Sequence, residues 1–377
     1  MKLPPLNTQL AILETRPWTK GEYAKQNWGV WMHSISAYVG RIKPSFAHFL
    51  IEIFSAEGNT ILDPFSGVGT IPLEADNMGR IAIANDLNPY ANIITKAKFD
   101  RQGLSNELIY LESIKDLDLT AETNHVPEWV KEFYHEKTLQ EILAIRKRLL
   151  ADGRDFLLGC LLGIVHGHRS THLSMRTGYI IPYIPNPKPV AEYREVLPRL
   201  ISKAKRMYSD KVPDTTNGTV IFGDARSLKL EDRSVDVIIS SPPYYHTLDY
   251  VHSNRLRLWF AGVDFENQDS LADNLIQQRN TYLSAMKEVG KELNRVMKDN
   301  ALCIFILGDV HLSAKNTLNT AQDISDLYKD LGFTTHAIVD DEIPASKTTI
   351  VKYGGENAIK NKKQKLDRIL VMSKNVT

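Results

Sequence analysis

Short apolar runs and longer stretches with helical spacing alternate along this chain. The apolar runs predict seven strands, at residues 60–62, 81–84, 219–223, 235–240, 301–307, 334–339 and 369–372. Apolar residues three and four positions apart predict helices, from Lys43-Pro44 to 54, through 71–75, over about 280–297 and over 321–331. Strands that alternate with helices predict an α/β fold with a Rossmann-like, doubly wound sheet.

Two regions depart from this alternation. Residues 1–30 show neither period and are predicted as an irregular leader, and residues 100–217 are mostly helical in pattern. We therefore predict three segments: 1–99 with the first part of the core, 100–217 as a large helical insertion, and 218–377 with the second part. Ligands of a doubly wound sheet bind beyond the carboxyl ends of its strands, where the strand order reverses.

Composition narrows the class of protein. Hydrophobic residues make up 43% of the 377 residues and charged residues 24%, as in ordinary globular proteins. No apolar run approaches the roughly 20 residues that cross a bilayer, and the N-terminus lacks the apolar core of a signal peptide. The two cysteines cannot form a disulfide framework, so we expect a cytoplasmic protein without a membrane partner.

Charge is concentrated locally. The net charge is only +1, but basic residues cluster at 199–211 and 360–368. These clusters are either solvated helix faces and a polar tail, or contacts to nucleic-acid phosphates, which depend on local rather than total charge.

The turn after the first predicted strand is rich in glycine. It reads Asp63-Pro-Phe-Ser-Gly67-Val-Gly69-Thr70, and Asp86 ends the next strand, where an acid typically binds ribose hydroxyls. The dinucleotide pattern Gly-x-Gly-x-x-Gly is absent, since Pro72 occupies the third position. A carboxylate at 63 suits a cationic ligand such as S-adenosylmethionine better than a pyrophosphate. The alternatives are a plain strand-to-helix turn and a nicotinamide dehydrogenase.

A rigid corner, Ser241-Pro242-Pro243-Tyr244, follows the strand at 235–240. The exocyclic amine of a base is a poor nucleophile, because its lone pair is delocalised into the ring. A serine oxygen and the Pro242 carbonyl, fixed by two prolines, could accept its N–H hydrogens, and Tyr244 offers a face on which an extruded base stacks. Ser240 is expected only to support the backbone. The alternative is a strand-ending turn.

These two motifs resemble those of the DNA amino-methyltransferases. The turn at 63–70 resembles the family's motif I, Asp86 its ribose contact, Gly223-Asp224-Ala225 its adenine contact and the Lys43-Pro44 helix start its motif X. The resemblance implies binding of S-adenosylmethionine by Lys43, Asp63, Pro64, Phe65, Gly67, Gly69, Thr70, Asp86, Leu87, Asp224 and Ala225. It implies catalysis by Ser241, Pro242, Pro243 and Tyr244. The resemblance covers about residues 40–100 and 219–375.

The resemblance also bears on the substrate. Ser-Pro-Pro-Tyr is similar to the corner of the N4-cytosine enzymes, whereas Asp or Asn at its first position is commoner among N6-adenine and RNA guanine-N2 enzymes. The carbon-5 class needs a reactive cysteine after proline, but Cys160 and Cys303 lie in apolar runs. The resemblance therefore implies a site-specific methyltransferase for cytosine N4 in double-stranded DNA, with a restriction endonuclease as an expected partner. The non-enzyme alternative is a DNA-binding protein with a methyltransferase fold that has lost its catalytic activity.

The insertion supplies the candidates for DNA contact. Residues 164–178 hold His166, His168 and His172, but their spacing matches no known ligand pattern, so we predict no metal. A histidine-rich loop without function is one interpretation. The other is contact with DNA by His168, Arg169, Arg176 and, after the corner, His246. The order of segments departs from that of many relatives, because motif I precedes the corner and the insertion precedes the adenine-contact segment. We assign target recognition to residues 100–217 because they are the large addition to the core.

Overall fold

The computed structural model describes residues 3–25, 28–100, 102–116, 118–178, 181–210, 216–243, 249–276, 278, 280–311, 317–343 and 365–376. Its centre is a seven-stranded sheet in the order β3-β2-β1-β4-β5-β9-β8. The strands are β1 (Thr60–Asp63), β2 (Ile81–Asp86), β3 (Thr219–Phe222), β4 (Val235–Ser240), β5 (Met297–Gly308), β8 (Phe333–Ile343) and β9 (Lys365–Lys374). The predicted doubly wound α/β fold and its seven strands are confirmed.

The strand order reverses between β1 and β4. Strands β3, β2, β1, β4 and β5 are parallel neighbours, and β9 runs antiparallel to both β5 and β8. The chain therefore moves outward from β1 to β3 and resumes on the other side of β1. The strands β1 and β4 are consequently neighbours. Near their beginnings the Asp236 carboxylate accepts the Thr60 N–H, although 176 residues separate the two residues.

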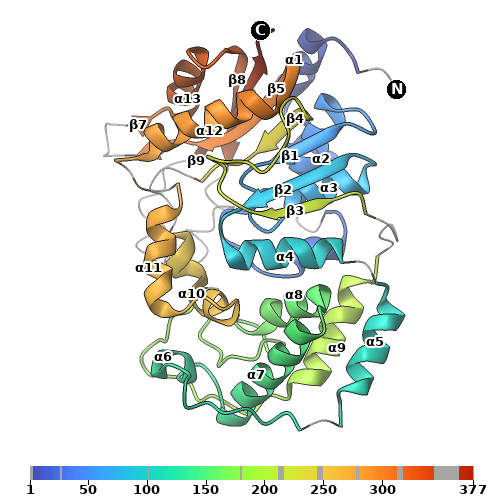
Figure 1. Cartoon of the computed structure of the whole chain (residues 1–377), viewed down its shortest axis with the longest axis vertical. Helices are drawn as coiled ribbons and strands as arrows, with labels where there is room; N and C mark the ends of the chain where they lie inside the picture. Colours follow the sequence, from blue (N-terminus) through green and yellow to red (C-terminus); the bar gives the residue numbers. More distant parts are fainter. Residues whose placement is uncertain are drawn as a thin grey trace.

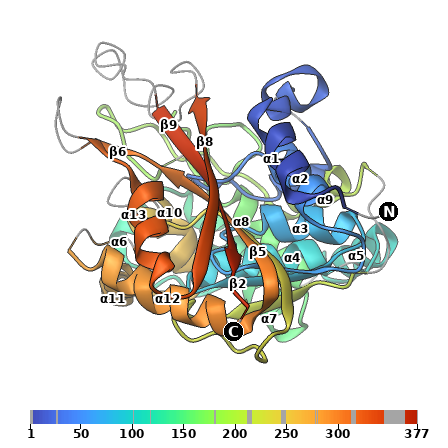
Figure 2. The ribbon, with the colours of Figure 1, turned by 90° about the horizontal axis from the view of Figure 1, so that it is seen from above.

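Helices cover both faces of this sheet (Figures 1 and 2). One face packs on α1 (Leu6–Glu14), α2 (Pro44–Phe54) and α3 (Thr70–Asn77), and the other on α12 (Tyr282–Val296) and α13 (Thr320–Lys329). Successive strand residues serve opposite faces, since Val237 and Ile239 join the first cluster and Ile238 the second. A small hairpin of β6 (Val310–His311) and β7 (Thr317–Leu318) follows β5.

The predicted irregular leader is partly helical. Besides α1 it contains the 3₁₀ turns η1 (Pro17–Thr19) and η2 (Gly21–Ala24), and η3 (Trp31–Ser34) follows. Only Gln9 and Leu13 of α1 are buried. Two buried positions are too few to produce a helical period in the sequence. The helix is held in place because Leu13, together with Trp18, packs into the hydrophobic cluster on this face of the sheet.

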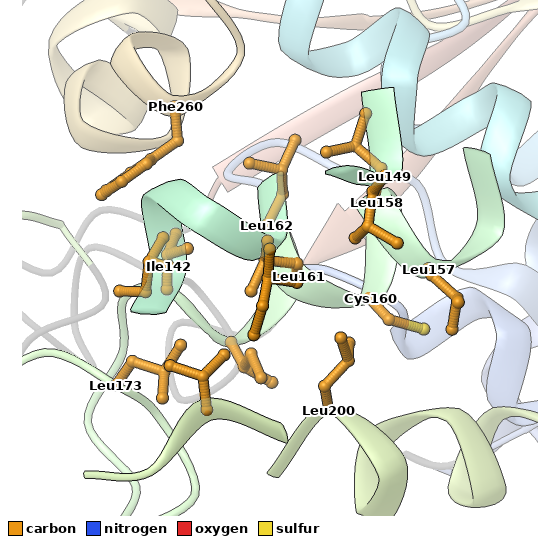
Figure 3. Close-up of a cluster of buried hydrophobic side chains, with 14 of the residues drawn as sticks. Ile142, Leu149, Leu157, Leu158, Cys160, Leu161, Leu162, Leu173, Leu200 and Phe260 are labelled. Atoms are coloured by element: carbon orange, nitrogen blue, oxygen red, sulfur yellow. The ribbon is translucent and has the colours of Figure 1, made fainter. Parts of the chain in front are cut away.

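A helical lobe lies below the sheet in Figure 1, with α4 (Pro89–Phe99) between them. It contains α5 (Leu104–Ser113), α6 (Glu128–Lys131), α7 (Glu136–Ala151), α8 (Asp155–Ile164) and α9 (Val196–Met207), joined by α10 (Tyr250–Phe260) and α11 (Phe265–Asn274). Figure 3 shows the centre of its core, where Leu161 and Leu162 of α8 meet Leu173 and Phe260.

The lobe packs closely on the sheet layer. A Cβ added at Gly159 of α8 would lie 2.3 Å from the Cβ of Ala97 in α4, so the two helices approach at a position that admits only glycine. One hydrophobic cluster takes side chains from α4, from the helical insertion and from α10. The division at 99 and 217 stays a prediction. In the described part of the chain, no helix combines the length and apolarity that crossing a membrane requires.

Candidate active site

A pocket opens where β1, β2, β3 and β4 end, the place where doubly wound sheets bind their ligands. It encloses about 840 Å³ of empty space, part of which is open to solvent. Nine of the predicted cofactor residues line it: Asp63, Pro64, Phe65, Gly67, Thr70, Asp86, Leu87, Asp224 and Ala225. Ser241 and Pro243 of the predicted catalytic corner line it as well. The two motifs that are distant in sequence thus meet at one pocket.

The glycine turn forms its floor. Gly67 and Gly69 have φ angles of +50° and +67°, which glycine adopts at little cost. Gly69 caps α3 but does not line the pocket, because it faces α4: a Cβ there would lie 2.6 Å from Thr95 Cγ2. Thr70, the first residue of α3, is 2% exposed, and its hydroxyl has no hydrogen-bond partner among the described residues. A ligand atom in the pocket could satisfy this hydroxyl.

Asp63 links the two motifs. Its Oδ1 accepts hydrogen bonds from Ser240 Oγ at 2.6 Å and from the Phe65 N–H at 3.2 Å. Burial raises the pKa of this carboxyl to about 7, since few protein groups offset the loss of water around its charge. Ser240 therefore does more than support the backbone: its hydroxyl ties the end of β4 to the end of β1.

Two further acids lie along the rim. The Asp86 carboxylate accepts the N–H of Gly67 at 2.7 Å and that of Asn88 at 2.8 Å, so it holds the glycine turn against the end of β2. Burial raises the pKa of Asp86 to about 6. Burial also works against the charge of Asp224, but two-pronged hydrogen bonding from Arg226 outweighs it and lowers the pKa of Asp224. All three predicted acids thus face one pocket in different charge environments.

The catalytic corner continues from β4. Ser241 Oγ donates a weak hydrogen bond to the Ile306 carbonyl of β5 at 3.3 Å, which leaves its lone pairs available to accept hydrogens from a ligand. Pro242 is buried and Pro243 faces the pocket. Tyr244 and His246 lie outside the described residues, so their predicted contacts stay predictions.

Lys43 lies outside the pocket lining, and its predicted contact with the cofactor stays a prediction. Its ammonium donates to the Tyr23 carbonyl and does not line the pocket. Arg41, two residues earlier, lines the pocket instead, and its guanidinium donates to the His33 carbonyl. No carboxylate of the described residues pairs with Arg41. Burial lowers its pKa, so an anionic ligand group would offset the cost of keeping this charge in the protein.

Aromatic residues that the sequence did not single out close the pocket. Tyr38, which follows the leader, stacks on Tyr250 of α10, with ring centroids 6.1 Å apart and planes at 25°. Both line the pocket, together with Asn274, Leu275 and Ile276. Tyr38 stands alone in an irregular stretch and Tyr250 follows the corner at a distance, so no periodicity or motif marks either.

The pocket fits the predicted cofactor by the chemistry of its walls. S-adenosylmethionine carries an ammonium and a sulfonium, a carboxylate, ribose hydroxyls and an adenine ring. The pocket offers the carboxylate of Asp63 to the cationic groups, the guanidinium of Arg41 to the carboxylate and the carboxylate of Asp86 to the hydroxyls. Apolar side chains of Phe65, Leu275 and Ile276 are available to the ring.

The loop at 165–178 separates into buried and exposed residues. His166 is buried, its Nδ1 lies 3.0 Å from Ser174 Oγ, and burial lowers its pKa to about 3. The candidates for DNA contact, His168, Arg169 and Arg176, are exposed. Within the described ranges, no three histidine, cysteine or acidic side chains gather as a metal site would require.

Helix α10 holds this loop beside the pocket. Arg257, only 1% exposed, donates from Nη2 to the His166 carbonyl at 2.7 Å. Arg255 donates to the Pro182 carbonyl at 2.8 Å and lies over the Trp129 ring at 5.7 Å. Because Tyr250 at the start of α10 lines the pocket, one helix connects the pocket wall to the exposed loop.

The two cysteines are core thiols, as predicted. Both are fully buried, and burial raises the pKa of Cys160 to about 12 and that of Cys303 further. A thiol that is buried in apolar surroundings in this way is a poor nucleophile.

Comparison with known proteins agrees with the motifs. A family model described as DNA methylase matches residues 17–96. The Type II methyltransferase M.BsoBI of Geobacillus stearothermophilus is 23% identical over 274 residues, which cover 62% of this chain and 53% of that protein. The chain thus spans about half the length of the curated relative that it matches.

The solved structures that match this chain include two methyltransferases. A putative DNA modification methylase of Thermus thermophilus, complexed with S-adenosyl-L-methionine, is 18% identical, with 41% of this chain and 52% of that chain covered and a TM-score of 0.26. A SAM-dependent methyltransferase of Methanosarcina mazei is 11% identical, with 87% and 98% covered and a TM-score of 0.36.

Proposed function

We propose that this chain is a DNA amino-methyltransferase that uses S-adenosylmethionine, and that it methylates the N4 amine of cytosine at a specific site in duplex DNA. One observation carries the proposal: the turn after β1 and the corner after β4 line the same pocket. A cofactor bound by the turn would therefore lie next to the residues suited to an exocyclic amine.

The chain's own residues supply positioning rather than covalent chemistry. When bound, S-adenosylmethionine supplies an electrophilic methyl group. Asp63 and Arg41 present opposite charges that orient a zwitterionic ligand in one direction. Ser241 Oγ and the Pro242 carbonyl accept the amine hydrogens, which draws the nitrogen lone pair out of conjugation with the ring. The Ser240–Asp63 hydrogen bond holds the end of β4 next to the end of β1, so the corner and the glycine turn keep their relative positions.

Cytosine is preferred over adenine because Ser241 opens the corner, where adenine enzymes more often carry an acid or asparagine. The match to a Type II methyltransferase supports a role in restriction–modification, with an endonuclease that shares the site and a location with the cell's DNA. That context is part of the proposal. N6-adenine and RNA guanine-N2 methylation are its competing outcomes.

The test follows the methyl group to a nucleoside. Purified protein is incubated with labelled S-adenosylmethionine and mixed-sequence duplex DNA, which is then digested and separated. We expect label in N4-methylcytosine, and none with Ser241→Ala although that variant still binds the cofactor in calorimetry. Label in N6-methyladenine contradicts the base assignment, and label in RNA alone contradicts the substrate. A parent protein that binds no cofactor would favour the non-enzyme alternative.

A further inference from the structure

A buried carboxylate lies behind the floor of the pocket. Glu74 is 3% exposed and follows Thr70 by four residues in α3, so the two side chains lie on the same face of the helix, one turn apart. Its Oε1 lies 2.5 Å from His33 Nε2, and its Oε2 lies 2.9 Å from His48 Nδ1. We call His33 of η3, Glu74 of α3 and His48 of α2 the Glu74 group; none of the three lines the pocket.

The hydrogen bonds of the Glu74 group run toward the carboxylate. Burial works against the charge of Glu74, but the hydrogen bonds to His33 and His48 outweigh it and lower its pKa to about 2. An ionised carboxylate only accepts, so His33 Nε2 and His48 Nδ1 both donate. Burial lowers the pKa of His33 to about 4, so at neutral pH this imidazole is uncharged and gives its one hydrogen to Glu74.

The His33 ring depends on Glu74 for its orientation. It is 2% exposed, and a Cβ added at Gly29 would lie 3.3 Å from its Cδ2, so the chain at Gly29 covers the ring closely. Among the residues that the structure describes, its Nδ1 has no hydrogen-bond partner. The bond to Glu74 is therefore the directional contact that ties this ring, and η3 with it, to α3.

The backbone of His33 carries the link to the pocket. Its carbonyl accepts a hydrogen bond from the guanidinium of Arg41, an exposed residue that lines the pocket. The next carbonyl, that of Ser34, accepts from Lys203 Nζ of α9 at 2.7 Å. The 3₁₀ turn η3 is thus held between α3 and α9, and its position decides where the Arg41 guanidinium lies.

We propose that the Glu74 group positions Arg41 to bind the carboxylate of S-adenosylmethionine, so that the pocket prefers a ligand with this carboxylate to one without it. The inference rests on the proposed function and adds to it three positioning residues outside the two motifs. A guanidinium binds a carboxylate strongly only where its planar fork meets the two oxygens in the right geometry. The preference therefore depends on buried residues that do not touch the ligand.

A pair of ligands isolates this contact. S-adenosylmethionine and its decarboxylated analogue share the sulfonium, the ammonium, the ribose and the adenine, and they differ in the carboxylate. Calorimetry with the full-length protein should show a preference for S-adenosylmethionine of about tenfold or more, as expected for a hydrogen bond between charged groups. Arg41→Met should remove that preference.

Substitutions in the Glu74 group test the positioning. Glu74→Met removes both hydrogen bonds and should lower the affinity for S-adenosylmethionine about five- to tenfold, with the affinity for the analogue within about twofold. His33→Phe keeps a ring and the backbone carbonyl, so it should give the same result and decides the question if Glu74→Met does not fold. Glu74→Gln still offers an acceptor and a donor to the two imidazoles and should keep most of the preference.

The effect of Glu74 should also require Arg41. In a protein that already carries Arg41→Met, adding Glu74→Met should not weaken S-adenosylmethionine further, because the positioning acts through the arginine. Glu141→Met is the matched control: the buried Glu141 carboxylate of α7 accepts from Tyr193 Oη at 2.6 Å and from the Val196 N–H at 2.9 Å, and Glu141 does not line the pocket. This variant should leave the preference unchanged.

The outcomes are distinguishable from those of the methylation test. A parent protein without the preference, equal losses for the two ligands in Glu74→Met and His33→Phe, or additive losses in the double variant overturn the positioning role. If the parent nevertheless methylates cytosine, the proposed function stands. If the preference changes as expected and label appears in another base, the positioning role stands and the base assignment fails. A parent that binds no S-adenosylmethionine overturns both.

Discussion

The two sides of the site are built on different principles. On the cofactor side, Asp63, Asp86, Asp224 and Ser241 sit at strand ends, and a parallel sheet brings such ends together whatever fills the helices. On the substrate side, the exposed loop and Pro182 depend on α10, which reaches them through arginine–carbonyl hydrogen bonds. The first side is fixed where the ends of neighbouring strands meet in the sheet. The second is fixed by arginine contacts from α10 to segments about 70 to 90 residues away.

The difference also concerns charge. The cofactor side keeps a buried carboxylate, Asp63, whose charge the protein only partly supports. The substrate side keeps a buried cation, Arg257, whose described partner is a backbone carbonyl. Affinity for the cofactor should therefore depend on ligand charge and pH. The KM for DNA should instead depend on single contacts between α10 and distant segments.

The largest effect is expected at Asp63. Asp63→Asn keeps the shape and the Ser240 hydrogen bond but removes the charge, and loss of one member of a buried charge pair costs about 2–5 kcal/mol. We expect affinity for S-adenosylmethionine, measured by calorimetry at pH 8, to fall at least about thirtyfold. Affinity for DNA should not change.

Ser240→Ala is the matched control, since it leaves the charge and removes one hydrogen bond. It should weaken the cofactor by about tenfold, within the roughly 0.5–3 kcal/mol of such a bond. Equal losses in the two variants would mean that geometry, not charge, makes Asp63 important.

A smaller effect follows from pH. Burial raises the pKa of Asp63 to about 7, so the carboxyl is protonated below that pH and ionised above it. A cationic ligand needs the ionised form, so affinity should be constant above pH 8 and fall by about 30-fold at pH 5.5, near tenfold per pH unit. Asp63→Asn should lose the step near pH 7 and keep a weaker one from Asp86, whose pKa burial raises to about 6. An unchanged profile in that variant would contradict the assignment.

The sequence predicted the cofactor side well because its signals are local. Apolar runs locate all seven strands, and the glycine turn and the diproline corner locate the pocket. The arginine that faces the pocket was missed in favour of Lys43, because the register of an irregular segment before α2 decides which cation points inward. Tyr38, Tyr250 and the Ser240 hydroxyl were missed for a related reason: their roles come from pairing between distant segments, which leaves no period in the sequence.

The smallest effect is expected on the substrate side, at Arg255. Arg255→Met removes the hydrogen bond to the Pro182 carbonyl and the contact with Trp129, so the segment around Pro182 should lose its attachment to α10. We expect the KM for DNA to rise five- to tenfold, about 1 kcal/mol, while the affinity for S-adenosylmethionine stays constant. Arg146→Met is the control: Arg146 also donates to a backbone carbonyl, that of Phe260, but it ties α7 to the end of α10 and makes no hydrogen bond to Pro182. If both variants raise the KM equally, the placement of α10 as a whole matters and the Arg255 contact does not. If only Arg255→Met does so, the hydrogen bond from Arg255 to the Pro182 carbonyl is what holds the substrate side in place.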